Sequence, residues 1–508
     1  MKAILPWHRR RKGPPAPPGR GLAALAWALA LLAAACTGDP APGPPPAAAP
    51  ATTVKPLPAP PACHGRIVQV GSDIQAAMDA AGPGGKLCLA AGIHRLVRPL
   101  EPKTGQWIGG RPGAILSGAK PITRWARESG RWFHAGDTRD PGPLVGECAD
   151  GTKACTYPDD VWRDRTRLVR VLSAAALRPG TVYIDYAADR IWVADDPTTA
   201  KLELSVASQA VVSGSNERGT AGVHLSGFVV ERFTSHFAVE MGPRWVVDGL
   251  EVRYNHVGGV ESGSHSILRN SHIHHQGELG LGGSGAAGAL VEGNRIDHNN
   301  TAGYDWSWEG GGSKWAAGTE RLTVRANHVF DNNGPGLWTD GDNVHTTYER
   351  NLVEGNLGPG IIHEISYDAV IRHNTVRNNA RSSAGRSIWW GSEIHVNSSQ
   401  RVEIYGNTVV SSVNGIGLVD VDRGSGRLGP YRVADVDVHD NTVSMTSGAE
   451  TGLVGRATAF QPAANNRFRH NTYQVPDPNG EFWQWQGPLN ADGWRANGQD
   501  RDGNMVGS

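Results

Sequence analysis

Short segments in which apolar and polar residues alternate recur along the second half of the chain. Each segment ends in a glycine or an asparagine, and these marks are Gly227, Gly249, Asn270, Asn294, Asn327, Asn351, Asn374, Asn407, Asn441 and Asn471. Alternation indicates strands, and a period in the low twenties that insertions lengthen is typical of a parallel β-helix. We therefore predict an all-β fold, a right-handed parallel β-helix over residues 206–475 whose stacked rungs share one core. We expect the asparagines to occupy tight turns and to form hydrogen bonds along the stack.

The segments outside this repeat predict the two ends of the helix and one interruption. Residues 73–81 have helical spacing, and we expect this short helix to cap the first rungs, within residues 62–120. Residues 121–205 are rich in tryptophan and aspartate, and their alternation favours a small inserted β module that resembles a sandwich. Residues 476–508 form a C-terminal tail that carries three tryptophans, and we expect it to pack against the end of the helix.

The N-terminus predicts export. A basic stretch at residues 9–12 precedes the apolar run of residues 21–32, so residues 1–36 are interpreted as a signal peptide of the lipoprotein type. Small residues directly before Cys36 resemble a bacterial lipobox, in which the cysteine is lipidated, but Ala33 stands where leucine is usual. Ordinary secretion therefore remains open. The Pro/Ala-rich residues 37–61 are interpreted as a linker that holds an extracellular or cell-surface protein off a bacterial membrane.

Cysteine usage agrees with an oxidising compartment. Beyond Cys36 the chain has four cysteines, Cys63, Cys88, Cys148 and Cys155, and four cysteines allow three pairings. Proximity in sequence favours Cys63–Cys88 and Cys148–Cys155 without excluding the others. Lysine plus arginine equals aspartate plus glutamate, 49 each, so the composition indicates no nucleic-acid partner. The sequence gives no basis for predicting an oligomeric state.

Two nearly identical phrases, Gly-Pro-Gly-Leu-Trp-Thr-Asp340 and Gly-Pro-Gly-Ile-Ile-His-Glu364, each end in a carboxylate. Asp340 lies 13 residues after Asn327 and Glu364 lies 13 residues after Asn351, so both occupy the same position on adjacent rungs. Neighbouring strands are about 4.8 Å apart, and the two side chains should project side by side. Retaining glycosidases hold their two carboxyl groups about 5–5.5 Å apart. The repeat therefore predicts a pair with that spacing.

The surroundings of this pair favour a sugar-binding cleft over a purely structural turn. Lys314 lies near the same column one rung earlier, where a cation would support an ionised nucleophile. Aromatic rings among acidic groups suit sugars, because C–H faces pack on rings while hydroxyl groups need acceptors. The candidate substrate-binding residues are Trp306, Trp308, Glu309, Trp338, Asp342, His363, Trp389, Trp390 and His395, with Glu393 and Asn397 beside the last. The histidines show no ligand spacing, so we predict no metal centre.

The stretch from Lys314 to Glu364 resembles the active-site segment of glycoside hydrolase family 120, which contains β-xylosidases and related retaining exo-enzymes. The chain from Cys63 to Tyr473 looks like the pectin-lyase-like β-helix proteins as a whole. The resemblance implies that Asp340 is the nucleophile and Glu364 the acid/base. It also implies a β-sandwich inserted into the helix. Gly341 and Ser366-Tyr367 differ from that family's pattern at positions that would line the substrate, and family 141 remains an alternative.

Three functions remain open at this point. The first is a membrane-tethered, retaining exo-glycoside hydrolase, similar to a xylosidase, that acts on an oligo- or polysaccharide of plant or microbial origin. The second is a polysaccharide lyase or uronate C5-epimerase, in which Lys314 or a nearby arginine abstracts a proton and calcium binds Glu309, Asp340, Asp342 and Glu364. The absence of an obvious arginine clamp weighs against it. The third is a non-catalytic surface protein that binds glycans. The hydrolase requires no cofactor, although a structural calcium ion is allowed.

Overall fold

The computed structural model describes residues 56–214, 219–381, 388, 391–411, 413–446, 448 and 450–507. The predicted signal peptide with Cys36, most of the linker, Trp389 and Trp390 lie outside these residues. Within the described ranges, no helix is long and apolar enough to span a membrane.

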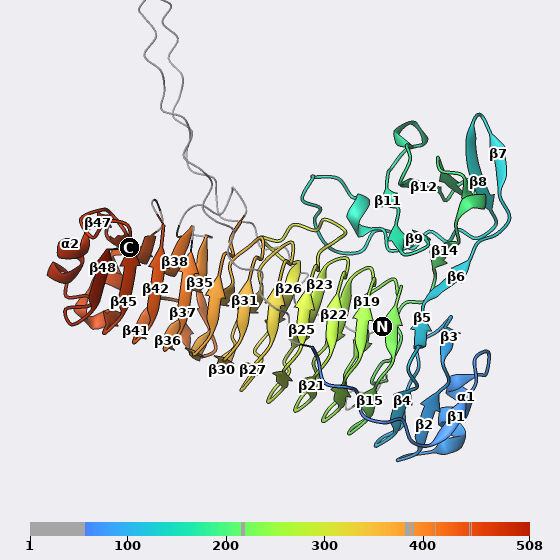
Figure 1. The fold of residues 1–508 in the computed structure, drawn as a ribbon, viewed down its shortest axis with the longest axis horizontal. Coiled ribbons are helices and arrows are strands. Elements are labelled where there is room, and N and C mark those ends of the chain that lie inside the picture. Colours follow the sequence, from blue (N-terminus) through green and yellow to red (C-terminus); the bar gives the residue numbers. More distant parts are fainter. Residues whose placement is uncertain are drawn as a thin grey trace, which may run out of the picture. The chain divides into compact units, whose positions relative to one another are not determined.

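Three long parallel sheets, here called A, B and C, form the body of the protein, and their strands stack side by side (Figure 1). Sheet A contains β1 (Arg66–Val68), β2 (Lys86–Leu89), β4 (Trp107–Gly110), β15 (His224–Ser226), β18 (Val246–Asp248), β21 (Ile267–Arg269), β24 (Leu290–Glu292), β27 (Thr323–Arg325), β30 (Val344–Glu349), β33 (Tyr367–Arg372), β36 (Gln400–Tyr405), β41 (Ala434–His439) and β44 (Arg467–Arg469). Sheet B contains β3 (Gly92–Arg95), β5 (Ala114–Ser117), β16 (Val229–Glu231), β19 (Glu251–Arg253), β22 (His272–His274), β25 (Arg295–Asp297), β28 (His328–Phe330), β31 (Leu352–Glu354), β34 (Thr375–Arg377), β37 (Thr408–Ser411), β42 (Thr442–Met445), β45 (Thr472–Val475) and β48 (Asn504–Gly507). Consecutive strands of one sheet lie one rung apart along the chain, which is the parallel β-helix that the period predicts.

Sheet C carries the candidate site. It contains β17 (Phe237–Glu240), β20 (Gly258–Glu261), β23 (Leu279–Ser284), β26 (Gly311–Ala316), β29 (Leu337–Asp340), β32 (Ile361–Glu364), β35 (Ser392–Asn397), β38 (Asn414–Asp420), β43 (Glu450–Gly455), β46 (Trp483–Trp485) and β47 (Pro488–Leu489). One buried cluster of apolar side chains runs through all three sheets, from Val68 to Trp494. The rungs therefore share a continuous core, as the sequence predicts.

Helix α1 (Ile74–Ala81) covers the N-terminal end of this core. Asp73 caps the helix by accepting a hydrogen bond from the backbone N–H of Ala76 at 3.0 Å, and Ile74 and Met78 face the core. The Cys63–Cys88 disulfide ties the preceding segment to β2. Both the capping helix and this pairing were predicted from the sequence and are confirmed.

An inserted module separates the first rungs from the rest. Its strands are β6 (Ala119–Pro121), β7 (Ala126–Glu128), β8 (Arg131–Ala135), β9 (Val161–Arg163), β10 (Thr166–Arg167), β11 (Val169–Arg170), β12 (Thr181–Asp185), β13 (Arg190–Val193) and β14 (Leu202–Ser205). They form a four-stranded and a five-stranded sheet, largely antiparallel, around a separate apolar cluster that includes Val161 and Ile191. The second predicted disulfide, Cys148–Cys155, lies in this module. Across the insertion β4 pairs with β15 and β5 with β16, so the helix continues without a break in register.

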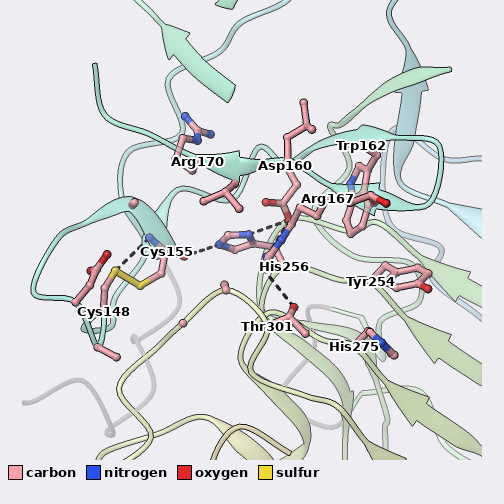
Figure 2. A pocket seen from close by; sticks show the side chains of 18 of the residues that line it. Cys148, Cys155, Asp160, Trp162, Arg167, Arg170, Tyr254, His256, His275 and Thr301 are labelled. Carbon is pink, nitrogen blue, oxygen red and sulfur yellow. Dashed lines mark hydrogen bonds and ion pairs between the residues drawn. A yellow bond between two sulfur atoms is a disulfide. The ribbon is translucent and has the colours of Figure 1, made fainter. Parts of the chain in front are cut away.

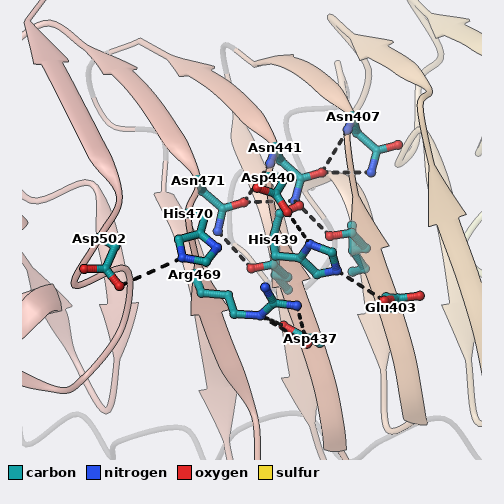
Figure 3. Close-up of polar contacts among 12 residues, drawn as sticks. Glu403, Asn407, Asp437, His439, Asp440, Asn441, Arg469, His470, Asn471 and Asp502 are labelled. Carbon is teal, nitrogen blue, oxygen red and sulfur yellow. Dashed lines mark hydrogen bonds and ion pairs between the residues drawn. The ribbon is translucent and has the colours of Figure 1, made fainter.

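A column of asparagines runs along the corner between sheets A and B. The backbone N–H and the Nδ2 of Asn327 both donate to Oδ1 of Asn351 at 3.0 Å, and the same pattern continues through Asn407 and Asn441 to Asn471 (Figure 3). Asp500 accepts from the last asparagine and ends the column. The predicted hydrogen bonding along the stack is thus confirmed.

The first three residues that marked the repeat, Gly227, Gly249 and Asn270, each lie one position before the column. Ser271, not Asn270, donates its backbone N–H to Oδ1 of Asn294 at 2.9 Å. Asn270 has φ 52° and Gly249 has φ 71°, so these marks are the left-handed residues that precede the column. Asn270 nevertheless lies in a tight turn and donates its Nδ2 to Oδ1 of Asp248, one rung earlier, at 2.9 Å, so it forms hydrogen bonds along the stack outside the column.

A second column explains the glycines of the two repeated phrases. Asn332, Asn356 and Asn379 form it, and each donates to the next at 2.7 or 2.8 Å. A Cβ added at Gly336 would lie 3.1 Å from Nδ2 of Asn356, and one at Gly360 would lie 2.8 Å from Nδ2 of Asn379. Even closer to these two Cβ positions, at 2.5–2.7 Å, are a carbonyl of the next rung and the side chain of Val353 or Val376. The amide column and the tight stacking of the rungs together keep both positions glycine.

Glu393 replaces glycine at the next rung and ends the second column. Asn379 donates its backbone N–H to Oε1 of Glu393 at 3.0 Å and its Nδ2 to Oε2 at 2.6 Å. Burial raises the pKa of Glu393 to about 8. A carboxyl group that was a candidate for the site on sequence grounds is therefore part of the scaffold.

The C-terminal tail packs against the end of the helix as predicted, but it is also a partial rung. β46 pairs with β43 in sheet C and β48 pairs with β45 in sheet B. Helix α2 (Ala491–Ala496) follows, and Trp483 and Trp494 are fully buried in the shared core. The residues after 475 lack the turn signature of the earlier rungs, so their strands escaped the sequence analysis.

Candidate functional site

The candidate site lies on the outer side of sheet C, along β26, β29 and β32. Side chains alternate across these strands, and Leu337 and Ile361 point into the shared core. Trp338 and Asp340 therefore point outward on β29, and Glu364 does so on β32. Asp340 and Glu364 are direct partners in the parallel register of the two strands. The predicted side-by-side placement of the two carboxylates is what this register provides.

Lys314 contacts Asp340 from a different position than the sequence suggested. Ala316 is the register partner of Asp340, so Lys314 lies two residues earlier on β26, opposite Trp338. The long lysine side chain reaches across this two-residue offset to Asp340. Lys314 Nζ lies 3.0 Å from Oδ2 of Asp340 and 3.8 Å from the centre of the Trp338 ring, and it donates to the carbonyl of Trp308. The ammonium group is buried, whereas the Asp340 side chain remains 23% exposed.

Glu364 is buried and sits among groups of both signs. Arg423 Nη1 donates to its Oε1 at 2.6 Å, and Asn397 Nδ2 donates to the same oxygen at 3.2 Å. Burial raises the pKa of Glu364 first of all, and the neighbouring Asp340 raises it further, while Arg423 and Lys314 oppose both effects. The result is a carboxyl group whose protonated form is favoured relative to an ordinary glutamate, next to a partly exposed carboxylate.

Arg423 belongs to a segment that the sequence analysis did not connect with the site. Residues 421–433, here called the arm, join β38 to β41 and contain the small hairpin of β39 (Ser425–Gly426) and β40 (Gly429–Pro430). Tyr367 Oη donates to the carbonyl of Gly429 at 2.7 Å, which fixes the arm against β33. The only sequence signal for it was the long interval between Asn407 and Asn441.

Asp342 anchors this arm. The backbone N–H of Arg427 donates to Oδ1 of Asp342 at 3.0 Å, and the Arg427 guanidinium donates to the carbonyl of Asp342 and pairs with Glu320 at 2.5 Å. Asp342 was expected to bind substrate, but its carboxylate is engaged by the arm. Its position supports a structural role.

Glu309 is buried beside a second carboxyl group, Glu278, which the sequence analysis missed. Burial raises the pKa of Glu278 well above its usual range, and Glu309, which shares a hydrogen bond with it, raises it further, whereas Lys314 opposes this. Glu278 lies at the start of a rung with no distinguishing pattern, so no sequence signal identifies it. This carboxyl pair flanks the buried side of Lys314, away from solvent.

The aromatic candidates have different environments. Trp338 is buried beneath the Lys314 ammonium, so its ring face is already occupied. Trp308 is 37% exposed and Trp306 is half-buried, which leaves these two as the described tryptophans with ring surface near the site. Trp389 and Trp390 lie outside the described residues.

The two histidine candidates are both buried but lie on opposite sides of sheet C: His363 lies on the core side, and His395 lies on the same side as Asn397. His363 points into the helix, where its Nδ1 lies 2.9 Å from Oγ1 of Thr339, and burial lowers its pKa to about 3. His363 and Glu364 are consecutive residues of β32, so their side chains point to opposite sides of the sheet. The placement of His363 therefore does not support a substrate contact. His395 is also fully buried, and burial lowers its pKa to about 4. Both rings are therefore neutral near pH 7.

Each acidic group at the site lies beside a cation or beside another acidic group. Within the described ranges, no three histidine, cysteine, aspartate or glutamate side chains are grouped so that they could hold a metal ion. Glu309, Asp340, Asp342 and Glu364 were the calcium ligands of the alternative reaction, and they do not form such a group. Asp340 faces Lys314 and Glu364 faces Arg423 instead.

The inserted module braces the loop that leads into the site. The backbone N–H of Asp305 donates to the carbonyl of Glu147 at 2.8 Å, and Cys148 forms a backbone bridge with Tyr304.

A cavity of about 550 Å³ lies between the module and the helix, where His256 Nδ1 lies 3.0 Å from Asp160 (Figure 2). None of the residues that line this cavity is Asp340, Glu364 or Lys314, so it is separate from the carboxylate pair.

Comparisons with known proteins agree on the fold. A family model described as the right handed beta helix region matches residues 237–400, which include both carboxylates. XylC in complex with xylose is similar in structure, with a TM-score of 0.66 and 14% identity over 85% of this chain and 82% of that chain. The A-module of the mannuronan C-5 epimerase AlgE6 from Azotobacter vinelandii gives a TM-score of 0.47 and 14% identity over 86% of this chain and 94% of that chain. No curated protein matches the sequence. The protein is thus a right-handed parallel β-helix.

Proposed function

We propose that this protein is a retaining, exo-acting glycoside hydrolase. The single observation that carries the proposal is the register pairing of Asp340 and Glu364 on adjacent outward-facing strand positions. Strand spacing of about 4.8 Å suits the carboxyl separation of about 5–5.5 Å that retaining enzymes use, and inverting enzymes need more room.

The environments of the two carboxyl groups fit different roles. Asp340 is the more exposed group and has a buried ammonium 3.0 Å away that compensates its negative charge, which suits a nucleophile that attacks the anomeric carbon. Glu364 has a raised pKa, which suits a general acid that protonates the leaving oxygen and then, as a carboxylate, activates water. A carboxyl group with a raised pKa beside a carboxylate that is paired with an ammonium group fits such a division of roles.

The choice of substrate begins from the structural likeness to XylC, which was solved with xylose. That likeness concerns the fold, so it determines which substrate is tested first and does not identify the substrate. Trp308 is 37% exposed and its carbonyl accepts a hydrogen bond from Lys314, so it is a candidate to pack against a sugar ring. A β-xyloside is therefore the first substrate to assay.

The decisive experiment is covalent trapping. A 2-deoxy-2-fluoro glycoside with a good leaving group should accumulate as a glycosyl ester on Asp340, which peptide mass spectrometry would locate. Asp340→Asn should bind the same sugar without forming the adduct. An adduct on another residue, or unchanged turnover in Asp340→Asn, would remove the proposal.

A second candidate, a uronate lyase or epimerase, gains from one observation. The sequence analysis counted the lack of an arginine clamp against it, but Arg423 lies at the site, 2.6 Å from Glu364. Proton abstraction by Lys314 would then give unsaturated, ultraviolet-absorbing products from uronic-acid polymers, or inverted configuration at C5. A non-catalytic glycan-binding protein would instead retain glycans without forming any product, and Glu364→Gln would not alter that retention.

The location outside a bacterial cell is a further part of the proposal and rests on the sequence of residues 1–61. A lipid anchor on Cys36 predicts that the protein fractionates with membranes and that Cys36→Ala releases it into the medium. Release of the unchanged protein would favour ordinary secretion.

A further inference from the structure

The acid candidate Glu364 is covered by a cation, which is an unusual arrangement for a group that must reach a neutral sugar. Arg423 holds Oε1 of Glu364 at 2.6 Å, and the arginine side chain is 35% exposed while that of Glu364 is 3% exposed. A guanidinium carries five donors, and among the described residues the structure gives that of Arg423 one hydrogen bond, to Glu364. Both Arg423 and Asn397 donate to Oε1, so a substrate that reaches this oxygen requires Arg423 to change partner.

A neutral sugar offers Arg423 only hydroxyl groups in exchange for a carboxylate. Charge-assisted hydrogen bonds are roughly twice as strong as neutral ones, so this exchange is unfavourable. A sugar that carries its own carboxylate can replace Glu364 as the partner of the guanidinium and can accept two parallel hydrogen bonds. Resting on the proposed hydrolase function, we infer that Arg423 selects a uronic acid at the sugar position between Asp340 and Glu364.

The exchange also prepares the acid. The charged groups that face Glu364 are Asp340 on β29, Lys314 on β26 and Arg423 on the arm, and Asn397 on β35 adds a neutral donor. When Arg423 turns to the substrate, Glu364 loses the nearest group that stabilises its charge. Its carboxylate then takes one proton from solvent, and it later transfers that proton to the glycosidic oxygen as the bond to the anomeric carbon breaks. Binding of the correct substrate and activation of the acid are thus one event.

The chemistry offers a matched set of three substrates. D-glucuronic acid is the ring of D-xylose with a carboxylate added at C5, and D-glucose has a hydroxymethyl group there instead. Their 4-nitrophenyl β-glycosides share the leaving group and the ring hydroxyls, so differences in rate report on the C5 substituent. The resemblance to xylosidases and the preference for a uronic acid are therefore compatible with one pocket.

The experiment compares kcat/KM for the three glycosides in the wild type, Arg423→Gln and Arg423→Lys. We expect the wild type to prefer the glucuronide over the xyloside by at least about 10-fold, and Arg423→Gln to lose about 100-fold on the glucuronide alone. Arg423→Lys should recover part of that loss, because it keeps the charge without the planar fork. Arg432→Gln, an exposed arginine of the same arm, is the control and should change neither rate.

Free sugars provide a readout that does not depend on turnover. The wild type should bind D-glucuronate more tightly than D-xylose or D-glucose by calorimetry, and Arg423→Gln should remove that difference. Hydrolysis of the xyloside with no preference for glucuronate in rate or binding would overturn the inference and leave the hydrolase proposal intact. Selective, Arg423-dependent binding of glucuronate without hydrolysis of any glycoside would support the inference for the site and overturn the hydrolase.

Discussion

Two buried glutamates on successive strands of sheet C have raised pKa values and opposite surroundings. Glu393 on β35 ends a column of asparagines, and both of its oxygens accept hydrogen bonds from Asn379. Glu364 on β32 lies beside Asp340 and is held by the side chains of Arg423 and Asn397. Burial is the main cause of the raised pKa in both cases. The raised pKa therefore does not identify a catalytic acid, and the neighbouring groups do.

The comparison is tested most strongly by removing each carboxyl group in turn. Glu364→Gln should lower kcat/KM for a glycoside with a poor leaving group by about 1,000-fold, because general acid catalysis contributes in this range. Glu393→Gln should keep the rate per folded molecule within about threefold, since Glu393 contacts the scaffold. Steady-state kinetics on an alkyl and a 4-nitrophenyl glycoside would measure both effects. Equal losses in the two variants would contradict the distinction drawn here.

The acid also predicts a pH dependence. Glu364 must be protonated to donate, so kcat/KM should fall as pH rises through its raised pKa. The wild-type profile should therefore have an alkaline limb, and Glu364→Gln should lack it, whereas Glu393→Gln should retain it. A limb of the same midpoint in Glu364→Gln would assign the titration to another group.

Lys314 offers a test of the nucleophile side of the site. Lys314→Met keeps most of the side-chain volume but removes the cation 3.0 Å from Asp340 and the contact with Trp338. Loss of one such electrostatic contact typically costs about 100-fold in kcat. Trapping kinetics with a fluorinated glycoside should slow in proportion, since Lys314 would act on the step that Asp340 performs. A change in KM alone would instead place Lys314 in ground-state binding.

The repeat allowed the position of Asp340 and Glu364 to be predicted, because the asparagine register converts sequence spacing into neighbouring rung positions. The same argument misplaced Lys314 by two residues, because it assumed a longer turn before Asn327. That turn has the ordinary length, and Ala316 is therefore the register partner of Asp340. Alternation along β32 already placed His363 on the opposite side from Glu364, and the sequence analysis did not apply it. Arg423 could not be predicted, because the period gives the length of an insertion and not the direction in which it folds.

Glu393 and the asparagine column that it ends belong to the scaffold. Disrupting this column should therefore lower the stability of the protein without lowering its catalytic rate. Asn356→Ala removes the side-chain amide that donates to Asn379 and to the carbonyl of Val329. It also leaves the backbone N–H and the Nδ2 of Asn332 without their acceptor in the column that ends at Glu393. Unsatisfied buried groups cost about 1–3 kcal/mol each, so the free energy of unfolding should fall by a few kcal/mol. Urea denaturation would measure the loss, with the exposed Asn497→Ala as the control. Folded protein should keep its rate on glycosides.

The smallest expected effect is the pH dependence of stability that Glu393 contributes. Its pKa is about 8 in the folded protein and 4.5 for an ordinary glutamate, so between these values the folded state binds a proton that the unfolded state does not. The stabilisation is complete below pH 4.5 and is lost as pH rises toward 8. Between pH 5 and pH 8 the wild type should therefore lose on the order of 3 kcal/mol more stability than Glu393→Gln. Urea midpoints at the two pH values measure this difference, and all other titrating groups are common to both proteins. Parallel pH profiles would mean that the two donors of Asn379 keep Glu393 ionised, which would make it unlike Glu364 in charge as well as in surroundings.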